Sequence, residues 1–276
     1  SGDMSFMMKS IADSDSAIGI DYQSVNKIVF YFNGLSPDRL NTGTTMTPDV
    51  WYHLVNVYDS VAGEMRTFIN GSKTTTAVTG TIGNNTSGAE FSIGSFGAWG
   101  GHNLNGAVDD AYIFDRALTD EEVSYLYNES NGIVAETTSI VDAVTIELDL
   151  LLVSVEDNLN ITEEDLPLEP DILLEVSTTE NITIKEGGGA DPYTKLLVHF
   201  DGNDDQTTYT AETGQTITFN GNAKLDTGYS KFGGSSLFCT DDSCWASVPD
   251  SDNWAFGTDN FTIDFWIKLD SIAANF

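Results

Sequence analysis

The sequence predicts an all-β fold with two β-rich segments, one at each end of the chain, and a small acidic β-rich connector between them. Residues 1–131 and 193–276 contain short segments in which apolar and polar residues alternate, as in strands with one buried face. Residues 133–191 contain no aromatic residue and no Cys.

The composition indicates a folded and strongly acidic chain. Of its 276 residues, 40% are hydrophobic and 11% are aromatic, and the net charge is -32. Nucleic acid and anionic membrane surfaces require clustered basic residues, so both are excluded as partners. The charge fits bound cations or simply a solubilising acidic surface. The longest apolar run, Leu148–Val153, is interrupted by Asp149, so no membrane insertion is expected.

The first segment begins with several predicted strands. Trp51–Tyr58 has the strongest pattern, and Asn70-Gly71 supplies a type I′ turn after the strand that follows it. The predicted strands are, in order, Met4–Ile11, Ala17–Tyr22, Lys27–Asn33, Trp51–Tyr58, Met65–Asn70 and Phe91–Gly94.

A strand and a capped helix close the first segment. Ala107–Phe114 alternates like a strand with one face on a core. Thr119 and Glu122 then form a capping box, and Asn131-Gly132 ends the helix. Its apolar stripe consists of Val123, Leu126 and Tyr127.

This closing stretch, NGAVDDAYIFDRALTDEEVSYLYN at Asn105–Asn128, resembles the end of laminin G-like modules of the concanavalin A-like lectin/glucanase superfamily. The hairpin WYHLVNVY…MRTFINGS, between Trp51 and Ser72, resembles a hairpin of the same modules. The resemblance implies a laminin G-like jelly-roll sandwich. It makes residues 1–131 the C-terminal half of such a module.

Residues 193–276 resemble the N-terminal half of the same module. Lys195–Gly202 resembles its opening strand, and Ser235–Cys239 and Trp245–Pro249 are further predicted strands. Phe261–Leu269 alternates without interruption, as a strand with an inward face should.

The connector, residues 132–192, contains one long apolar strand pattern. Its buried face would consist of Val144, Ile146, Leu148, Leu150 and Leu152. A strand of this kind promotes aggregation when it is unpaired, so we expect it to be covered. Two alternatives are open: the connector forms its own small sheet or lies on the adjacent module, or it donates the strand to a neighbouring subunit.

The complementary halves allow three arrangements. The chain can be a circular permutant, copies of it can complete each other head to tail, or it can be one period of a longer tandem repeat. The absence of an initiator Met and a signal peptide fits a mature, tagged or excised chain. We favour an extended array, because heterologous contacts that do not close generate filaments.

Two features predict an extracellular location or the surface of a cell or virion. Cys239 and Cys244 enclose four residues between two predicted strands, so a disulfide across a hairpin is geometrically reasonable. Seven sequons give weaker support for a glycoprotein, because many arise by chance in an Asn-, Ser- and Thr-rich chain. They lie at Asn70, Asn84, Asn85, Asn128, Asn160, Asn181 and Asn260.

The resemblance implies a structural calcium ion. Members of the superfamily often hold one near the meeting point of the first and last strands, through carboxylate and carbonyl oxygens. The matching positions are Asp201 and Gly202 of the opening strand and Asp109 and Asp110 of the closing strand. Alternatively, Asp109 and Asp110 are exposed strand residues and Asp201 is a turn former.

Catalysis is not expected. Glycosidases of this superfamily carry paired carboxylates on one strand, whereas Phe261–Leu269 offers Asp264 and no Glu. His53, His102 and His199 lie apart from any nucleophile motif.

A glycine-rich loop at Phe96–Asn103 is the candidate glycan site. Trp99 would provide a ring on which a sugar stacks, and His102 and Asn103 would provide hydrogen bonds. Alternatively, Trp99 fills the end of the sandwich.

The sequence therefore predicts a non-enzymatic structural subunit of an extracellular filament, fibre or surface adhesin, whose partners are copies of itself. The alternative is a calcium-dependent, lectin-like module of a cell-surface or virion protein that binds glycans.

Overall fold

The computed structural model describes residues 4–9, 18–23, 27–80, 90–95, 102–130, 172–176, 182–186, 192–240 and 243–271. They fall into two compact units, residues 1–123 together with 192–276, and residues 124–191. None of the helices in these ranges is long and apolar enough to cross a membrane.

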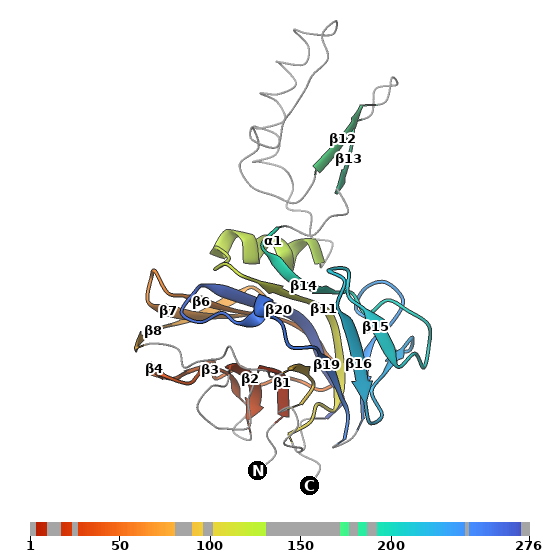
Figure 1. Cartoon of the computed structure of the whole chain (residues 1–276), viewed down its shortest axis with the longest axis horizontal. Helices are drawn as coiled ribbons and strands as arrows, with labels where there is room; N and C mark the ends of the chain where they lie inside the picture. Colours follow the sequence, from red (N-terminus) through yellow and green to blue (C-terminus); the bar gives the residue numbers. More distant parts are fainter. Residues whose placement is uncertain are drawn as a thin grey trace, which may run out of the picture. The chain divides into compact units, whose positions relative to one another are not determined.

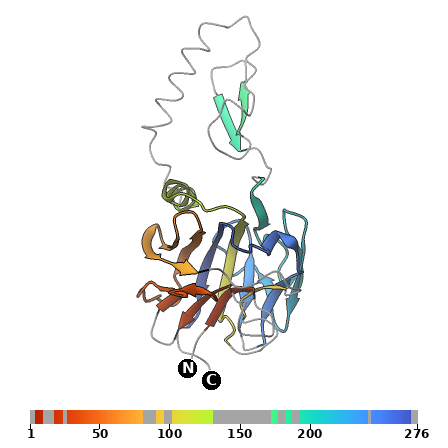
Figure 2. The same ribbon diagram turned by 60° about the vertical axis from the view of Figure 1, so that its left-hand side comes forward.

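The first unit is a sandwich of two antiparallel sheets, and each sheet takes strands from both chain segments (Figures 1 and 2). The first sheet has the order β15-β16-β19-β10-β1-β2-β3-β5. Its strands span, in that order, Thr208–Thr210, Thr216–Asn220, Trp245–Val248, Phe91–Ile93, Met4–Lys9, Ile18–Gln23, Lys27–Phe32 and Arg39–Asn41. The junction between the segments is the pairing of β10 with β19.

The second sheet has the order β17-β18-β11-β20-β6-β7-β8, and β14 also pairs with β11. The strands of the main path span Lys224–Asp226, Ser236–Cys239, Gly106–Phe114, Phe261–Leu269, Trp51–Asp59, Glu64–Ile69 and Ser72–Ala77, and β14 spans Thr194–Val198. Two short strands, β4 (Leu35–Ser36) and β9 (Thr79–Gly80), pair separately. In this sheet β20, from the end of the chain, lies between β11 and β6 of the first segment (Figure 1).

The apolar core lies between the two sheets. In β20 the alternate residues are all buried in it, which confirms the inward face predicted from the sequence; they are Phe261, Ile263, Phe265, Ile267 and Leu269. The ring of Phe265 meets the edge of Phe6 on β1, with 6.3 Å between ring centroids. The predicted all-β sandwich is therefore confirmed, and its core is shared by the two segments.

The capping box at the start of helix α1 (Asp120–Ser130) is confirmed. The Thr119 amide donates to Oε2 of Glu122 at 2.7 Å, and the Glu122 amide donates to Oγ1 of Thr119 at 3.2 Å. Val123 is fully buried, whereas Leu126 and Tyr127 are only half-buried. The helix ends directly before the predicted Asn131-Gly132 stop.

The loop between the two cysteines differs from the prediction. We expected a hairpin, but β18 belongs to the second sheet and β19 to the first. Cys239, the last residue of β18, and Cys244, directly before β19, therefore flank strands of different sheets. The hairpin prediction was wrong because short strands joined by a short loop have the same sequence pattern in both arrangements.

In the second unit, the described strands pair only with each other. Strand β12 (Ile172–Val176) pairs with β13 (Ile182–Glu186) in an antiparallel two-stranded sheet. The strand predicted around Val144, Ile146, Leu148, Leu150 and Leu152 lies outside the described residues.

Candidate functional site

A β-bulge in strand β11 lies at two of the predicted metal ligands, Asp109 and Asp110. The register between β11 and β20 shifts between Asp109 and Tyr112. Asp110 adopts a φ of 43°, in the left-handed region that non-glycine residues rarely occupy. Asp109 is completely buried, which corrects the alternative expectation that it is an exposed strand residue.

The Asp109 carboxylate holds a loop of the second segment, Tyr229–Ser235. Its Oδ2 accepts hydrogen bonds from the amides of Lys231 at 2.7 Å and Phe232 at 3.1 Å. Its Oδ1 accepts one from the Asp110 amide at 3.0 Å. A carboxylate in this position therefore links β11 to a chain segment more than a hundred residues away.

Asp201 holds the same loop from the other side. Its Oδ1 accepts a hydrogen bond from the Gly234 amide at 2.8 Å. A Cβ atom on Gly233 would lie 1.7 Å from that oxygen, and Gly233 has a φ of 53°. Only glycine fits there. The neighbouring Gly202 donates its amide to Oγ of Ser235 at 2.9 Å.

The buried acids of this site have raised pKa values. Burial raises the pKa of Asp109 to about 7, although the amides of Lys231 and Phe232 oppose the shift. Burial also raises the pKa of Asp110, against a hydrogen bond with His199. That hydrogen bond, 2.7 Å between Oδ1 of Asp110 and Nδ1 of His199, raises the pKa of the imidazole.

These contacts leave the predicted calcium ligands engaged with the protein itself. Asp109, Asp110 and Asp201 each use a carboxylate oxygen in the hydrogen bonds above. Within the described ranges, no three His, Cys, Asp or Glu side chains are grouped so that they could hold a metal ion. An ion held by Asp109, Asp110, Asp201 and Gly202 stays a prediction.

A second His–Asp pair lies on the same face of the second sheet. Nε2 of His53 lies 2.9 Å from Oδ1 of Asp264, and both side chains are almost fully buried. The His53 ring stacks on Trp266 with 5.0 Å between centroids. Oδ2 of Asp264 is buried and has no hydrogen-bond partner among the described residues.

The sequence did not reveal these pairs, because their members lie far apart in the chain. The charge of Asp264 also contributes to the raised pKa of Asp110, so a second carboxylate does lie near Asp264. Asp264 is too buried to reach a sugar, however, because its side chain is only 4% exposed. The pair of acids thus fits a structural network better than the two carboxylates of a glycosidase, which must contact substrate.

The candidate glycan loop is described only at its end. Trp99 lies outside the described residues. His102 is exposed with a φ of 60°, and its carbonyl accepts a hydrogen bond from the Ser5 amide at 2.6 Å. Asn103 is 7% exposed, and its Oδ1 has no hydrogen-bond partner within the described part of the chain.

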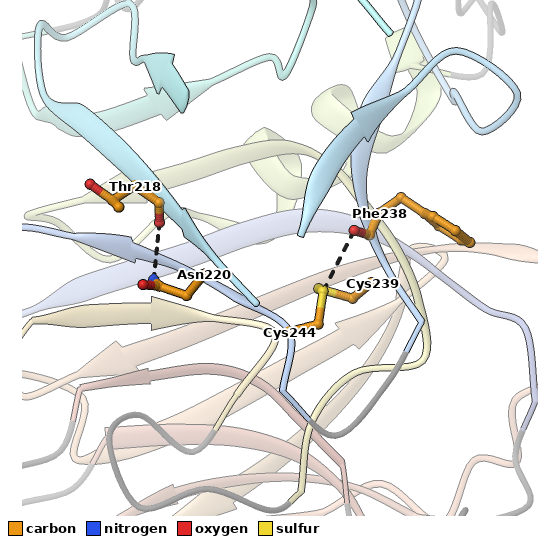
Figure 3. Close-up of a disulfide and its surroundings, with 5 residues drawn as sticks. All are labelled: Thr218, Asn220, Phe238, Cys239 and Cys244. Atoms are coloured by element: carbon orange, nitrogen blue, oxygen red, sulfur yellow. Dashed lines mark hydrogen bonds between the residues drawn. A yellow bond between two sulfur atoms is a disulfide. The ribbon is translucent and has the colours of Figure 1, made fainter. Parts of the chain in front are cut away.

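The disulfide between Cys239 and Cys244 is present in the structure, and both residues are fully buried (Figure 3). Sγ of Cys244 lies 3.7 Å from the carbonyl oxygen of Phe238. Nearby, Nδ2 of Asn220 donates to the carbonyl of Thr218 at 3.3 Å. The disulfide bond joins the last residue of β18, in the second sheet, to the residue directly before β19, in the first sheet.

Three of the seven sequons fall on described residues. Oδ1 of Asn70 accepts from the His53 amide at 2.8 Å, and Oδ1 of Asn260 accepts from the Ser60 amide at 2.8 Å. Nδ2 of Asn128 donates to Oγ of Ser124 at 3.3 Å. The sequons at Asn84, Asn85, Asn160 and Asn181 lie outside the described residues.

The contacts of the Tyr229–Ser235 loop were missed by sequence reasoning. One signal was available: the Gly233-Gly234 pair indicates a place where another group approaches the backbone closely. The sequence did not show that the approaching group is the Asp201 carboxylate.

Comparison with known proteins gives a match in the first segment. Residues 2–124 match the family model described as the concanavalin A-like lectin/glucanases superfamily. No curated protein and no solved structure matches the chain. The matched residues contain the hairpin and the closing strand on which the predicted resemblance was based.

Proposed function

We propose that this chain, whose residues 2–124 match the family model of the concanavalin A-like lectin/glucanases superfamily, is a structural subunit of an extracellular filament, fibre or surface adhesin. In this proposal, copies of the chain are joined head to tail. Residues 192–271 of one copy complete the sandwich begun by residues 4–123 of the next.

The central position of β20 carries the proposal. This strand pairs with β6 from Phe261–Tyr58 to Lys268–Trp51, and with β11 on its other side. Without residues 192–271, the second sheet would be open in its middle and the core would lose the inward face of β20. Because both sheets need both segments, neither segment is a complete module.

The same contacts can be made within one chain or between two. The segments are connected in sequence only through residues 124–191, which form a separate compact unit. Exchange of an identical element between protomers adds no new kind of contact and is a common route to oligomers. Because the exchanged interface is heterologous, repetition gives an open chain of copies unless it closes into a ring.

The location is part of the proposal. The disulfide and the sequons are consistent with the outside of a cell or with a virion surface. No catalytic role is included in this function.

Complementation between two defective chains tests the proposal. Phe265→Asp disrupts the second segment and Leu54→Asp disrupts the first, since both side chains are fully buried in the shared core. Each variant alone can form no intact sandwich. Refolded together, they can form one intact sandwich between chains.

The expected result is a mixture that regains near-ultraviolet circular dichroism and a cooperative thermal transition, and that elutes as an oligomer. A chain carrying both substitutions, mixed with either single variant, is the matched control and should regain neither. If the two single variants stay unfolded when mixed, the segments work only within one chain and the proposal fails.

A calcium-dependent glycan-binding module is the second candidate. It is supported by the glycine-rich sequence Phe96–Asn103 and by His102, which is exposed and can offer a hydrogen bond to a sugar. A glycan array with and without calcium tests it: a preference that Trp99→Ala and His102→Ala both abolish supports this candidate, and binding of no glycan contradicts it.

A further inference from the structure

Lys9 is a buried lysine at the end of a core strand. It is the last residue of β1, opposite Phe91 of β10, which in turn lies opposite Val248 of β19. Side chains opposite one another on adjacent strands leave the sheet on the same face. Phe91 and Val248 belong to the apolar core, so the Lys9 side chain runs along the core rather than into solvent.

The Lys9 ammonium has little to compensate for this burial. The Lys9 side chain is 2% exposed, and its Nζ lies 3.5 Å from Oδ1 of Asp250. No other hydrogen bond or ion pair of this amine is formed with a residue that the structure describes. One long contact does not offset the desolvation of an ammonium group that has three donors.

Asp250 and a second acid, Asp252, lie two residues apart in the chain. Asp250 follows β19 by two residues, and Asp252 opens the short 3-10 helix Asp252–Trp254. Burial lowers the pKa of Lys9, while the charges of Asp250 and Asp252 act in the opposite direction. The amine is thus a potential nucleophile in apolar surroundings, with one carboxyl group beside it and a second one nearby.

We propose that Lys9 and Asp250 condense into an isopeptide bond that joins β1 of the first segment to the end of β19 of the second. This is a covalent modification site, and its substrate is the protein's own carboxyl group. It does not depend on the head-to-tail function, because Asp250 can come from the same chain or from another.

The reaction balances with water as its only by-product. A proton passes from the Lys9 ammonium to the Asp250 carboxylate, which leaves a neutral amine and a neutral acid. Nζ attacks Cγ of Asp250, and a C–N bond forms. The tetrahedral centre then loses one carboxyl oxygen, which leaves as water with protons from the former carboxyl group and from the amine.

Asp252, two residues from Asp250 in the chain, is the acid assigned to move these protons. It is close enough for its charge to act on Lys9. A carboxylate can take the proton from the attacking nitrogen and return it to the leaving oxygen.

Proximity and burial favour the product. Fixed groups in good orientation react with effective molarities of about 10⁵–10⁸ M, which offsets the unfavourable equilibrium of amide formation in water. The product also replaces a buried ammonium by a neutral amide, which is less costly to bury. Asp250 is 39% exposed, so the released water has a direct path to solvent.

Intact mass spectrometry of the full-length chain, after folding, reduction and denaturation, tests the proposal. The expected mass is below the value for the reduced sequence by the mass of one water molecule. Digestion should give a branched peptide that joins Lys9 to Asp250.

Variants of the pair sharpen the test. Asp250→Ala and Lys9→Arg should both show their full sequence masses. Asp250→Asn should lose ammonia instead of water and give the same final product as the wild type. Asp252→Asn should slow bond formation by a factor of about 10² or more, because it keeps both reactants and removes the proton relay.

The chain contains matched controls for distance alone. Nζ of Lys224 lies 2.7 Å from Asp205, and Nζ of Lys195 lies 2.9 Å from Asp115, but both of these amines are more exposed than Lys9. Although the pairs are closer, they should stay unlinked, because hydrated charges do not condense. A branched peptide at either pair would contradict the role given to burial.

The proposal is overturned if the folded wild-type chain has its full sequence mass, or if the water loss persists in Asp250→Ala. A reducing, denaturing gel distinguishes failure of the isopeptide proposal from failure of the proposed head-to-tail function. Linked monomers support the bond and argue against exchange between chains, a ladder supports both, and unlinked chains that still assemble support only the head-to-tail function.

Discussion

Asp109 shows how a single buried residue connects the two ends of this chain. Its carboxylate accepts hydrogen bonds from the amides of Lys231 and Phe232, in a loop of the second segment. The raised pKa of about 7 means that the folded state binds a proton there more readily than the unfolded chain does. Stability should therefore depend on pH.

We predict that the free energy of unfolding decreases as the pH rises from about 4 to about 7. The contribution of Asp109 is fully present below the pKa of an ordinary Asp and is lost as the pH passes the folded pKa of about 7. The contribution of Asp109 to the free energy of unfolding changes by at most about 4 kcal/mol, because its pKa is raised from 3.8 to about 7 and each pKa unit corresponds to about 1.4 kcal/mol. Urea titrations across this range measure it.

Asp109→Asn is the control for the pH prediction. The amide keeps an acceptor for the loop but does not titrate, so the slope between pH 4 and 7 should be smaller than in the wild type. An unchanged slope would assign the pH dependence to another group, such as Asp110, whose pKa is also raised from that of an ordinary Asp by burial.

Gly233 tests the contact between Asp201 and the loop. An added Cβ would overlap Oδ1 of Asp201, and the φ of 53° is unfavourable for alanine. We predict that Gly233→Ala lowers the free energy of unfolding by about 1–3 kcal/mol. Gly234→Ala is the matched control, because a Cβ there would meet nothing within 4 Å. Equal effects of the two substitutions would contradict the account of the loop.

Strand β20 was predicted well from the sequence, because a period of two over nine residues reports a strand with one buried face. Its neighbours β11 and β6 lie more than a hundred residues away in the chain. The alternating pattern of β20 does not show which strands pair with it. The resemblance to a known module predicted that they belong to the same sandwich as β20, but not that they flank it in one sheet. The Cys239–Cys244 loop shows the limit, since strand patterns do not say which sheet a strand joins.

The two faces of β20 should respond differently to truncation. Phe265 is fully buried, and we predict that Phe265→Ala lowers the free energy of unfolding by about 3–5 kcal/mol. Lys268 lies on the opposite face, with Nζ 4.0 Å from the centroid of the Tyr229 ring. Lys268→Ala should cost about 1 kcal/mol or less. Chemical denaturation of both variants gives the comparison, and similar losses would mean that β20 does not face the core as described.

At the scale of the whole molecule, the two segments share one sandwich and one core. The fold class could be predicted from strand patterns and family-like motifs, because these can be read from short stretches of the sequence. The His53–Asp264 and Asp110–His199 pairs did not follow, since each joins residues from different segments. A site assembled across segments becomes visible only when the strand order is known.

The central claim is that the shared sandwich can be completed between chains as well as within one. Sedimentation velocity of the wild-type chain, refolded over a wide range of protein concentrations, tests it most directly. We predict monomers at low concentration and a series of elongated oligomers, each longer by one chain, at high concentration. Folded monomers at every concentration would contradict the claim.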